Sequence, residues 1–270
     1  MLRKGDLTQG GIITTLLQFT LPMLAGSLLQ QCYNIADTLI VGQCIGANAL
    51  AAVGSAYTLM VFLISILLGL SMGSGTVFSL QYGAGDLSAL RRSIYVSLLL
   101  IGTVTILLNV AVFLWLDPIL RWLQVPYDIY SLMRNYLWII FWGIVFTFLY
   151  NFYAALLRAV GDSVTPLWFL AVSVVLNIGL DLFLILVLDQ GIEGAAVATV
   201  IAQGTAASGI LLYTYKTRPE LRLHREDMCF DRSSLREITS FSTLTCVQQS
   251  VMNFGILMVQ GLVNSFGTVV

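Results

Sequence analysis

Two polar side chains interrupt a long apolar stretch and have the chemistry to bind an ion. Asn177 and Asp181 lie within Leu167–Leu188, a run long enough to cross a bilayer. Their spacing of four residues places both side chains on the same face of a helix. A carboxylate at membrane depth costs roughly 2.5–3.5 kcal/mol on insertion scales. We therefore expect a cation, a proton or a substrate at Asp181 that offsets this cost.

Three further polar residues are expected at a similar depth in neighbouring spans. Counted at about 1.5 Å per residue, all of these side chains lie about 8–13 Å from the outer ends of their spans. Carboxylate, amide and hydroxyl oxygens together form a hard ligand set, which suits Na⁺ and, with fewer groups engaged, a proton. The alternative is that the amide and carboxylates only bridge helices or face an aqueous vestibule. The predicted cation site is Asp37, Tyr136, Asn177, Asp181 and Thr199, and for Na⁺ the ligands would be Asp37, Asn177, Asp181 and Thr199.

Pro22 lies in the first apolar run, on the N-terminal side of Asp37. Proline removes one hydrogen bond from a helix and weakens it locally. The residue is therefore either a hinge that bends when Asp37 changes its charge or partner, or a static kink.

The composition identifies the chain as an integral membrane protein. Of its 270 residues, 58% are hydrophobic and 10% are charged, whereas a soluble domain has about 25% charged residues. The net charge of −1 gives no support to nucleic-acid binding. The four cysteines lack the spacing of a metal site and are expected to be apolar filler or free thiols.

Seven apolar runs reach the length of about 20 residues that a spanning helix needs. Because the runs are continuous rather than alternating, the predicted fold class is an all-α membrane protein: a six-span bundle, a linker and a seventh span. The runs are Ile12–Val41, Ala49–Leu80, Ile94–Leu116, Leu132–Leu157, Leu167–Leu188, Ala195–Tyr215 and Ile238–Phe266.

The distribution of Lys and Arg predicts the orientation. With a cytoplasmic N-terminus, only Arg121 and Arg134 of the 13 Lys and Arg residues fall outside, in agreement with the positive-inside rule. Residues 1–215 then form a six-span lobe, and residues 216–237 form a solvated cytoplasmic linker. Residues 238–270 are expected to be the first span of an incomplete second lobe.

Enzyme signatures are absent from the sequence. The chain contains no HExxH, GxSxG, P-loop or GxGxxG motif, and its single histidine, His224, lies in the linker. We therefore expect no enzymatic activity and no cofactor. Without a nucleotide-binding loop, transport powered directly by ATP would require another subunit.

Several blocks, taken in order, resemble the MATE (multidrug and toxic compound extrusion) family, in its DinF-like or a related bacterial branch. Each block is modest on its own, but together they cover the whole six-span lobe. They are Pro22 with Asp37, Gly42 and Gly46; Gln81-Tyr82-Gly83-Ala84-Gly85-Asp86; Arg158-Ala159-Val160-Gly161-Asp162 with Pro166; Asn177-Ile178-Gly179-Leu180-Asp181; and Gly191–Thr199 with Gln203.

The resemblance implies a twelve-span exporter of the cell membrane, with two six-span lobes around a central cavity. By alternating access it would exchange Na⁺ or H⁺ for cationic or amphipathic small molecules, and its first span would bend at Pro22. The cation network at the matching positions would be Asp37, Tyr136, Asn177, Asp181 and Thr199. Its partners would be these small molecules, the lipid bilayer and the C-terminal lobe, of which nearly all is missing here.

Two alternatives compete with the cation-coupled antiporter. The first is a flippase for lipid-linked saccharides, which would be expected to line its cavity with basic residues, whereas these spans carry acidic ones. The second is a non-transporting truncated product or assembly partner, which the sequence downstream of residue 270 would distinguish. Na⁺ and H⁺ use the same oxygen ligands, so both remain candidates for the coupling ion.

Overall fold

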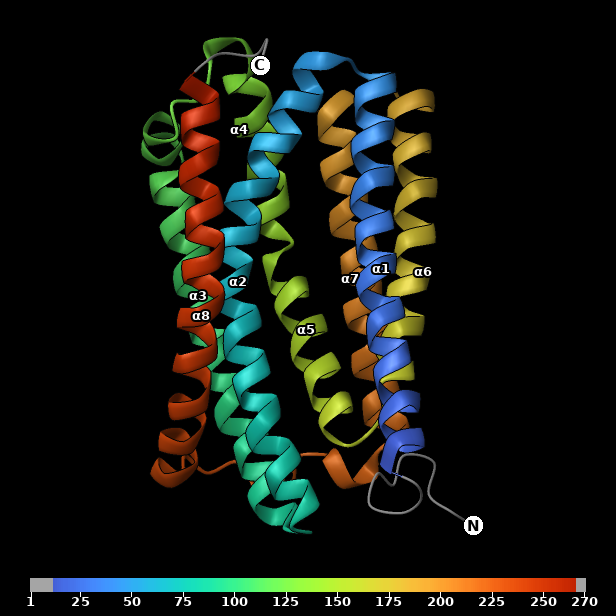
Figure 1. Cartoon of the computed structure of the whole chain (residues 1–270), viewed down its shortest axis with the longest axis vertical. Helices are drawn as coiled ribbons and strands as arrows, with labels where there is room; N and C mark the ends of the chain where they lie inside the picture. The colour runs from blue at the N-terminus through green and yellow to red at the C-terminus, as the bar shows by residue number, and fades with distance from the viewer. Residues whose placement is uncertain (1–11, 266–270) are drawn as a thin grey trace.

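The computed structural model describes residues 12–265, and helices make up nearly all of this range (Figure 1). No strand occurs between these two residues, so the predicted all-α class is confirmed. The elements are α1 (Ile12–Cys44), α2 (Ala47–Gly83), α3 (Leu87–Trp122), α4 (Tyr127–Trp142), α5 (Ile144–Ala159), α6 (Val164–Leu182), the π-helical turn η1 (Phe183–Val187), α7 (Gly191–Thr217), the 3₁₀ turn η2 (Pro219–Leu221) and α8 (Arg232–Ser265).

Each predicted apolar run coincides largely with a helix or a bent pair of helices. Within the described residues, five helices are long and apolar enough to cross a membrane, and the bent pair α4–α5 would add a sixth. The first helix, α1, is not among these five, and its second half carries Gln30, Gln31, Asn34 and Asp37. The membrane class is thus confirmed, while the count of seven spans stays a prediction.

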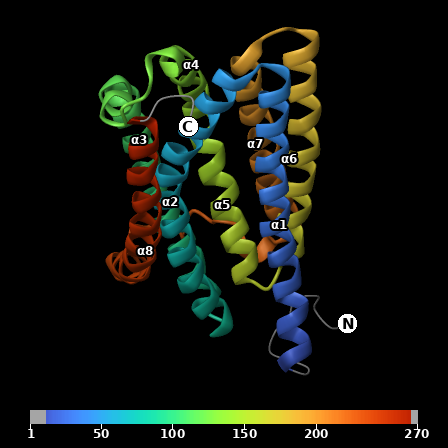
Figure 2. The same ribbon diagram turned by 45° about the horizontal axis from the view of Figure 1, so that its top comes forward.

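Two groups of helices lie on either side of α5. Figures 1 and 2 show α1, α6 and α7 side by side in one group, and α2, α3 and α8 in the other. Because α5 packs on both α2 and α7, it connects the two groups. Large aromatic side chains fill this junction: the rings of Phe78 on α2 and Phe152 on α5 meet edge to face with their centroids 5.9 Å apart.

The most extensive helix pair is α2 with α8. A Cβ atom at Gly69 would collide with the backbone of Cys246, and one at Gly73 would collide with the backbone of Ser242. The Ser242 hydroxyl also donates to the carbonyl of Leu70 at 3.1 Å. Small residues of this kind let two helix backbones touch within a bilayer, where van der Waals packing drives association.

The fourth predicted span, Leu132–Leu157, is not one continuous helix. It is divided at Gly143 into α4 and α5, which meet at a bend of 48°. The Gly143 N–H donates to the Ile140 carbonyl at 2.8 Å, an i to i−3 bond that replaces the regular helical one. The predicted span is therefore bent at this position, which the sequence did not indicate.

The predicted solvated linker is in fact partly docked on the bundle. The Leu221 side chain belongs to the main hydrophobic core, and Asp227 is buried. The Arg91 guanidinium Nε lies 3.0 Å from Asp227 Oδ2, as an ion pair without good hydrogen-bond alignment. At the other end of the segment, Arg218 Nη2 donates to Asp162 Oδ2 at 3.2 Å. The expectation of a solvated connector is therefore wrong for these residues.

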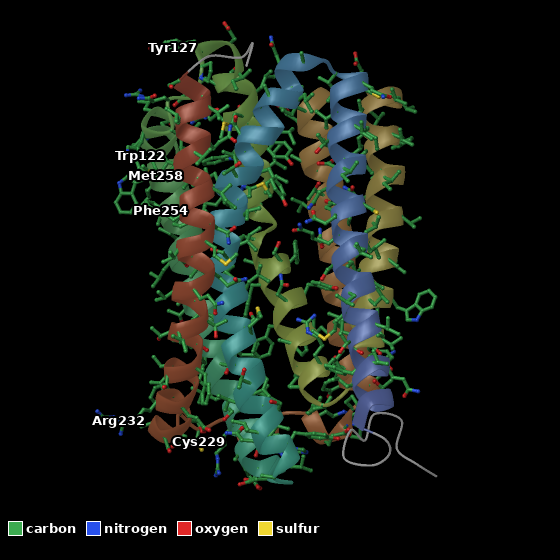
Figure 3. The ribbon with its side chains drawn as sticks, viewed as in Figure 1. Trp122, Tyr127, Cys229, Arg232, Phe254 and Met258 are labelled. Atoms are coloured by element: carbon green, nitrogen blue, oxygen red, sulfur yellow. The ribbon has the colours of Figure 1, made fainter. Side chains whose placement is uncertain are left out.

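The last helix begins at Arg232, inside the segment that was predicted to be linker. Asp231 precedes it and accepts hydrogen bonds from the Ser234 hydroxyl and from the backbone N–H groups of Ser233 and Ser234. These bonds hold the pKa of the Asp231 carboxyl below its usual value. Figure 3 shows Arg232 at the end of the molecule opposite Tyr127, so α8 runs the full length of the bundle.

Candidate cation site

The carboxyl groups of Asp37 and Asp181 meet between α1 and α6. Asp181 is fully buried and Asp37 is 8% exposed. The two carboxyl groups lie close enough for each to act on the charge of the other. One oxygen of each, Oδ1, is buried without a hydrogen-bond partner among the described residues. Because buried polar atoms are normally paired, these two oxygens are candidates for binding a further group.

Asn177 joins the carboxylate pair to α7. In one orientation of its amide, Nδ2 donates to the Thr199 hydroxyl at 3.4 Å. In the other, Nδ2 donates to Asp181 Oδ2 at 2.9 Å and Oδ1 accepts from the Thr199 backbone N–H at 3.3 Å. We favour the second orientation, because it points an N–H at the carboxylate, whereas the first turns an amide oxygen towards acceptors.

Thr199 and Tyr136 complete the set predicted from the sequence. Thr199 lies on α7 and Tyr136 on α4, and both side chains are buried. Tyr136 is close enough to Asp37 and Asp181 for their charges to act on it. All five predicted residues therefore come together, from α1, α4, α6 and α7.

The structure adds Tyr33, which the sequence interpretation did not include. Its hydroxyl donates to Thr199 Oγ1 at 3.4 Å. Tyr33 precedes Asp37 by four residues and so projects from the same face of α1. That spacing is the signal that could have identified it.

Small residues on α7 and a π-helical turn after α6 lie next to the site. Ala195, Ala196 and Ala198 on α7 are fully buried, which allows close approach to neighbouring helices. Two residues after Asp181, at Phe183, the π-helical turn η1 begins. Turns of this type widen the helix locally and are frequent at functional sites.

Pro22 lies apart from the cluster, inside α1, which continues as a helix on both sides of it. The structure thus contains no break at this proline. Its role as a hinge stays a prediction.

The described residues of the cluster present only oxygen and amide groups, a set that suits a hard cation or a proton. Within the described residues, no group of three or more His, Cys, Asp or Glu side chains could hold a metal ion. Two carboxylates, one amide and hydroxyl groups instead supply oxygen ligands. Such ligands suit a hard cation such as Na⁺, whereas many transition metals are bound by imidazole or thiolate groups.

Fold and site together define a multi-pass helical membrane protein with a buried carboxylate pair between its spans. The family model MatE matches residues 22–183. The chain therefore belongs to the MatE family, and the resemblance seen in the sequence is confirmed.

Relatives and solved structures agree with this assignment. The chain is 34% identical over 262 residues to "Probable multidrug resistance protein YpnP" of Bacillus subtilis, covering 97% of this chain and 58% of that protein. It is 28% identical to "Multidrug export protein MepA" of Staphylococcus aureus, covering 90% of this chain and 54% of that protein. An outward-facing multidrug resistance MATE family transporter superposes with a TM-score of 0.88 at 22% identity, over 95% of this chain and 57% of that one. The chain thus spans little more than half the length of these proteins.

Proposed function

We propose that the chain is the cation-binding lobe of a multidrug antiporter, which exchanges Na⁺ or H⁺ for cationic or amphipathic compounds by alternating access. It would act in the plasma membrane with its N-terminus in the cytoplasm, together with a second lobe. The named relatives, a multidrug resistance protein and a multidrug export protein, support the cargo class.

The observation that carries the proposal is the pair formed by Asp37 and Asp181. Two like charges at this depth repel each other in a low dielectric, so a bound cation or a shared proton stabilises the pair. When that ion is released, the two carboxylates repel each other again. The site therefore has two states that differ in charge, and this is the property that a coupling site needs.

The available energy is sufficient for coupling. One charge that moves across 100 mV supplies about 2.3 kcal/mol, and a tenfold ion gradient adds about 1.4 kcal/mol. In our proposal the cation enters from outside, binds between Asp37 and Asp181, and favours release of the cargo outwards.

Cation binding by the chain itself is the first test. The 270-residue chain is purified in lipid nanodiscs, and binding of ²²Na⁺ is measured at pH 8, together with proton uptake on a shift to pH 5.5. We expect one of the two ions to bind to the parent and not to Asp181→Asn. The control is Asp128→Asn, which removes an exposed carboxylate from the first turn of α4.

Transport is the second test. Ethidium is added as the probe to the medium around everted membrane vesicles that contain the chain, alone or with a second lobe from a MatE relative. We expect ethidium movement to respond to an imposed Na⁺ gradient or pH gradient. Ethidium transport that depends on neither gradient would overturn the proposal. Equal ion binding by the parent and Asp181→Asn would do the same.

A further inference from the structure

The break between α4 and α5 lies against the same turn of α7 that carries Thr199. Val200, the next residue, packs on Gly143 at the bend: a Cβ atom at Gly143 would come within 2.9 Å of Val200 Cγ2 and 3.1 Å of the Ile140 carbonyl oxygen. Such contacts are tighter than side chains normally tolerate. Only glycine lets α7 approach the break this closely.

A hydrogen bond one turn further along α7 ties the same segment to α5. The Thr147 hydroxyl, in the first turn of α5, donates to Gln203 Oε1 at 2.6 Å. The carbonyl of Thr147 in turn accepts from Asn151 Nδ2 at 2.8 Å. Because Thr199 and Gln203 are four residues apart, they lie on one face of α7. One turn of α7 therefore contacts the cation cluster at its beginning and α5 at its end.

A small void lies at the bend between α4 and α5. A cavity of about 10 Å³ adjoins the break, lined by Thr147, Gln203 and apolar side chains of α2, α4 and α5. Protein interiors are otherwise close-packed and resist small displacements. The bend between α4 and α5 therefore combines a small packing void with a backbone that departs from regular α-helical hydrogen bonding.

From these contacts we infer that Gly143 is a hinge within the lobe and that Gln203 is a positioning residue, which couples cation occupancy at Thr199 to the tilt of α5. The inference rests on the proposed cation site. A cation that draws Asn177 and Thr199 towards Asp181 shifts the turn of α7 that begins at Thr199. Val200 and Gln203 pass this shift to Gly143 and Thr147, and the angle between α4 and α5 changes.

The angle can be measured with a spin label at each end of the bent pair. The labels are placed at Tyr127, which is almost fully exposed at the start of α4, and at Ala159, at the end of α5. The four native cysteines are replaced by alanine, and the whole chain is studied in nanodiscs. Distances are recorded in Na⁺-free buffer at pH 8, after addition of Na⁺, and at pH 5.5.

Thr147→Val and Thr147→Ser form a matched pair for this test. Valine keeps the shape of threonine but cannot donate to Gln203, whereas serine keeps the donor. We expect the parent and Thr147→Ser to show a cation-dependent shift of the Tyr127–Ala159 distance. Thr147→Val and Gln203→Leu should lose the shift while ²²Na⁺ binding or proton uptake persists.

The outcomes separate this inference from the proposed function. A shift of equal size in Thr147→Val and Thr147→Ser would overturn the role of the hydrogen bond. Cation binding by the parent without any change in distance would overturn the hinge alone. If the parent binds neither Na⁺ nor protons, the proposed cation site is wrong, and both proposals are overturned.

Discussion

Asp37 on α1 and Asp181 on α6 turn their carboxyl groups towards each other, and each keeps one buried oxygen without a partner among the described residues. The two residues are far apart in the sequence and meet only because α1 packs on α6. The stability of the lobe should therefore depend on what occupies the space between these groups, because unscreened like charges oppose the contact between the helices.

The first prediction concerns Asp181→Asn. In Na⁺-free buffer at pH 8 the variant should melt at a higher temperature than the parent, because one of two repelling charges is gone. A coupling cation that binds only the folded state stabilises the parent by about 1.4 kcal/mol for each tenfold rise in concentration above its Kd. The variant should lose this gain. Thermal unfolding at increasing Na⁺ concentration, and separately at decreasing pH, measures both effects. An unchanged cation dependence in Asp181→Asn would contradict the prediction.

The second prediction concerns Tyr33, the residue that the structure adds to the cluster. Tyr33→Phe removes the hydroxyl that donates to Thr199 Oγ1 at 3.4 Å. An uncharged hydrogen bond contributes about 1 kcal/mol, so cation affinity should fall about fivefold. Tyr57→Phe is the matched control, since the Tyr57 hydroxyl accepts from Asn34 outside the carboxylate pair. Titration of ²²Na⁺ binding or proton uptake distinguishes the two variants. Equal cation affinity in Tyr33→Phe and Tyr57→Phe would show that Tyr33 does not contribute to the site.

Counting residues along straight helices was enough to place Asp37, Tyr136, Asn177, Asp181 and Thr199 in one layer. The rise per residue of a helix is nearly constant, so depth can be read from sequence position once the topology is known. The structure brings these residues together. Their role in binding a cation stays a prediction. Tyr33 was missed because the rule that residues four apart share a helix face was applied to Asn177 and Asp181 but not to Tyr33 and Asp37.

Features that depend on distant residues could not be found in this way. The sequence around Gly143 is largely apolar and gives no sign of the break, at which Gly143 lies against Val200 on another helix. The linker has the composition of a solvated segment, yet Asp227 is buried because Arg91, on α3, lies beside it. Neither the contact with Val200 nor the ion pair with Arg91 can be predicted from the composition of the local sequence.

The third prediction concerns this docking of the linker. Asp227→Asn removes the charge that faces Arg91 and leaves a partly buried guanidinium without its counterion. We expect a loss of about 1–3 kcal/mol in the local stability of the linker. The control is Glu226→Gln, which removes the neighbouring exposed carboxylate. Limited trypsin digestion should cut Asp227→Asn faster after Arg222 and Arg225 than it cuts the parent or the control. Equal rates in all three proteins would show that the ion pair does not hold the segment.

The last prediction concerns the seam between α2 and α8. Gly73→Ala places a methyl group against the backbone of Ser242, and backbone cannot move aside as a flexible side chain does. We expect destabilisation by about 1–3 kcal/mol, the usual cost of overpacking. Gly255→Ala on α8 is the matched control, because a Cβ atom there meets nothing within 4 Å. Alanine also favours helix over glycine, so the control should be neutral or more stable by up to about 1 kcal/mol.

Two measurements check the seam. Thermal unfolding in detergent should show a lower melting temperature for Gly73→Ala than for the parent. The melting temperature of Gly255→Ala should be unchanged or higher. A disulfide between cysteines introduced at Leu70 and Ser242, whose carbonyl and hydroxyl are hydrogen-bonded at 3.1 Å, should form readily in the parent background and slowly when Gly73→Ala is added. Rapid cross-linking in both backgrounds, with equal melting temperatures, would mean that α8 does not depend on the close approach that Gly73 permits.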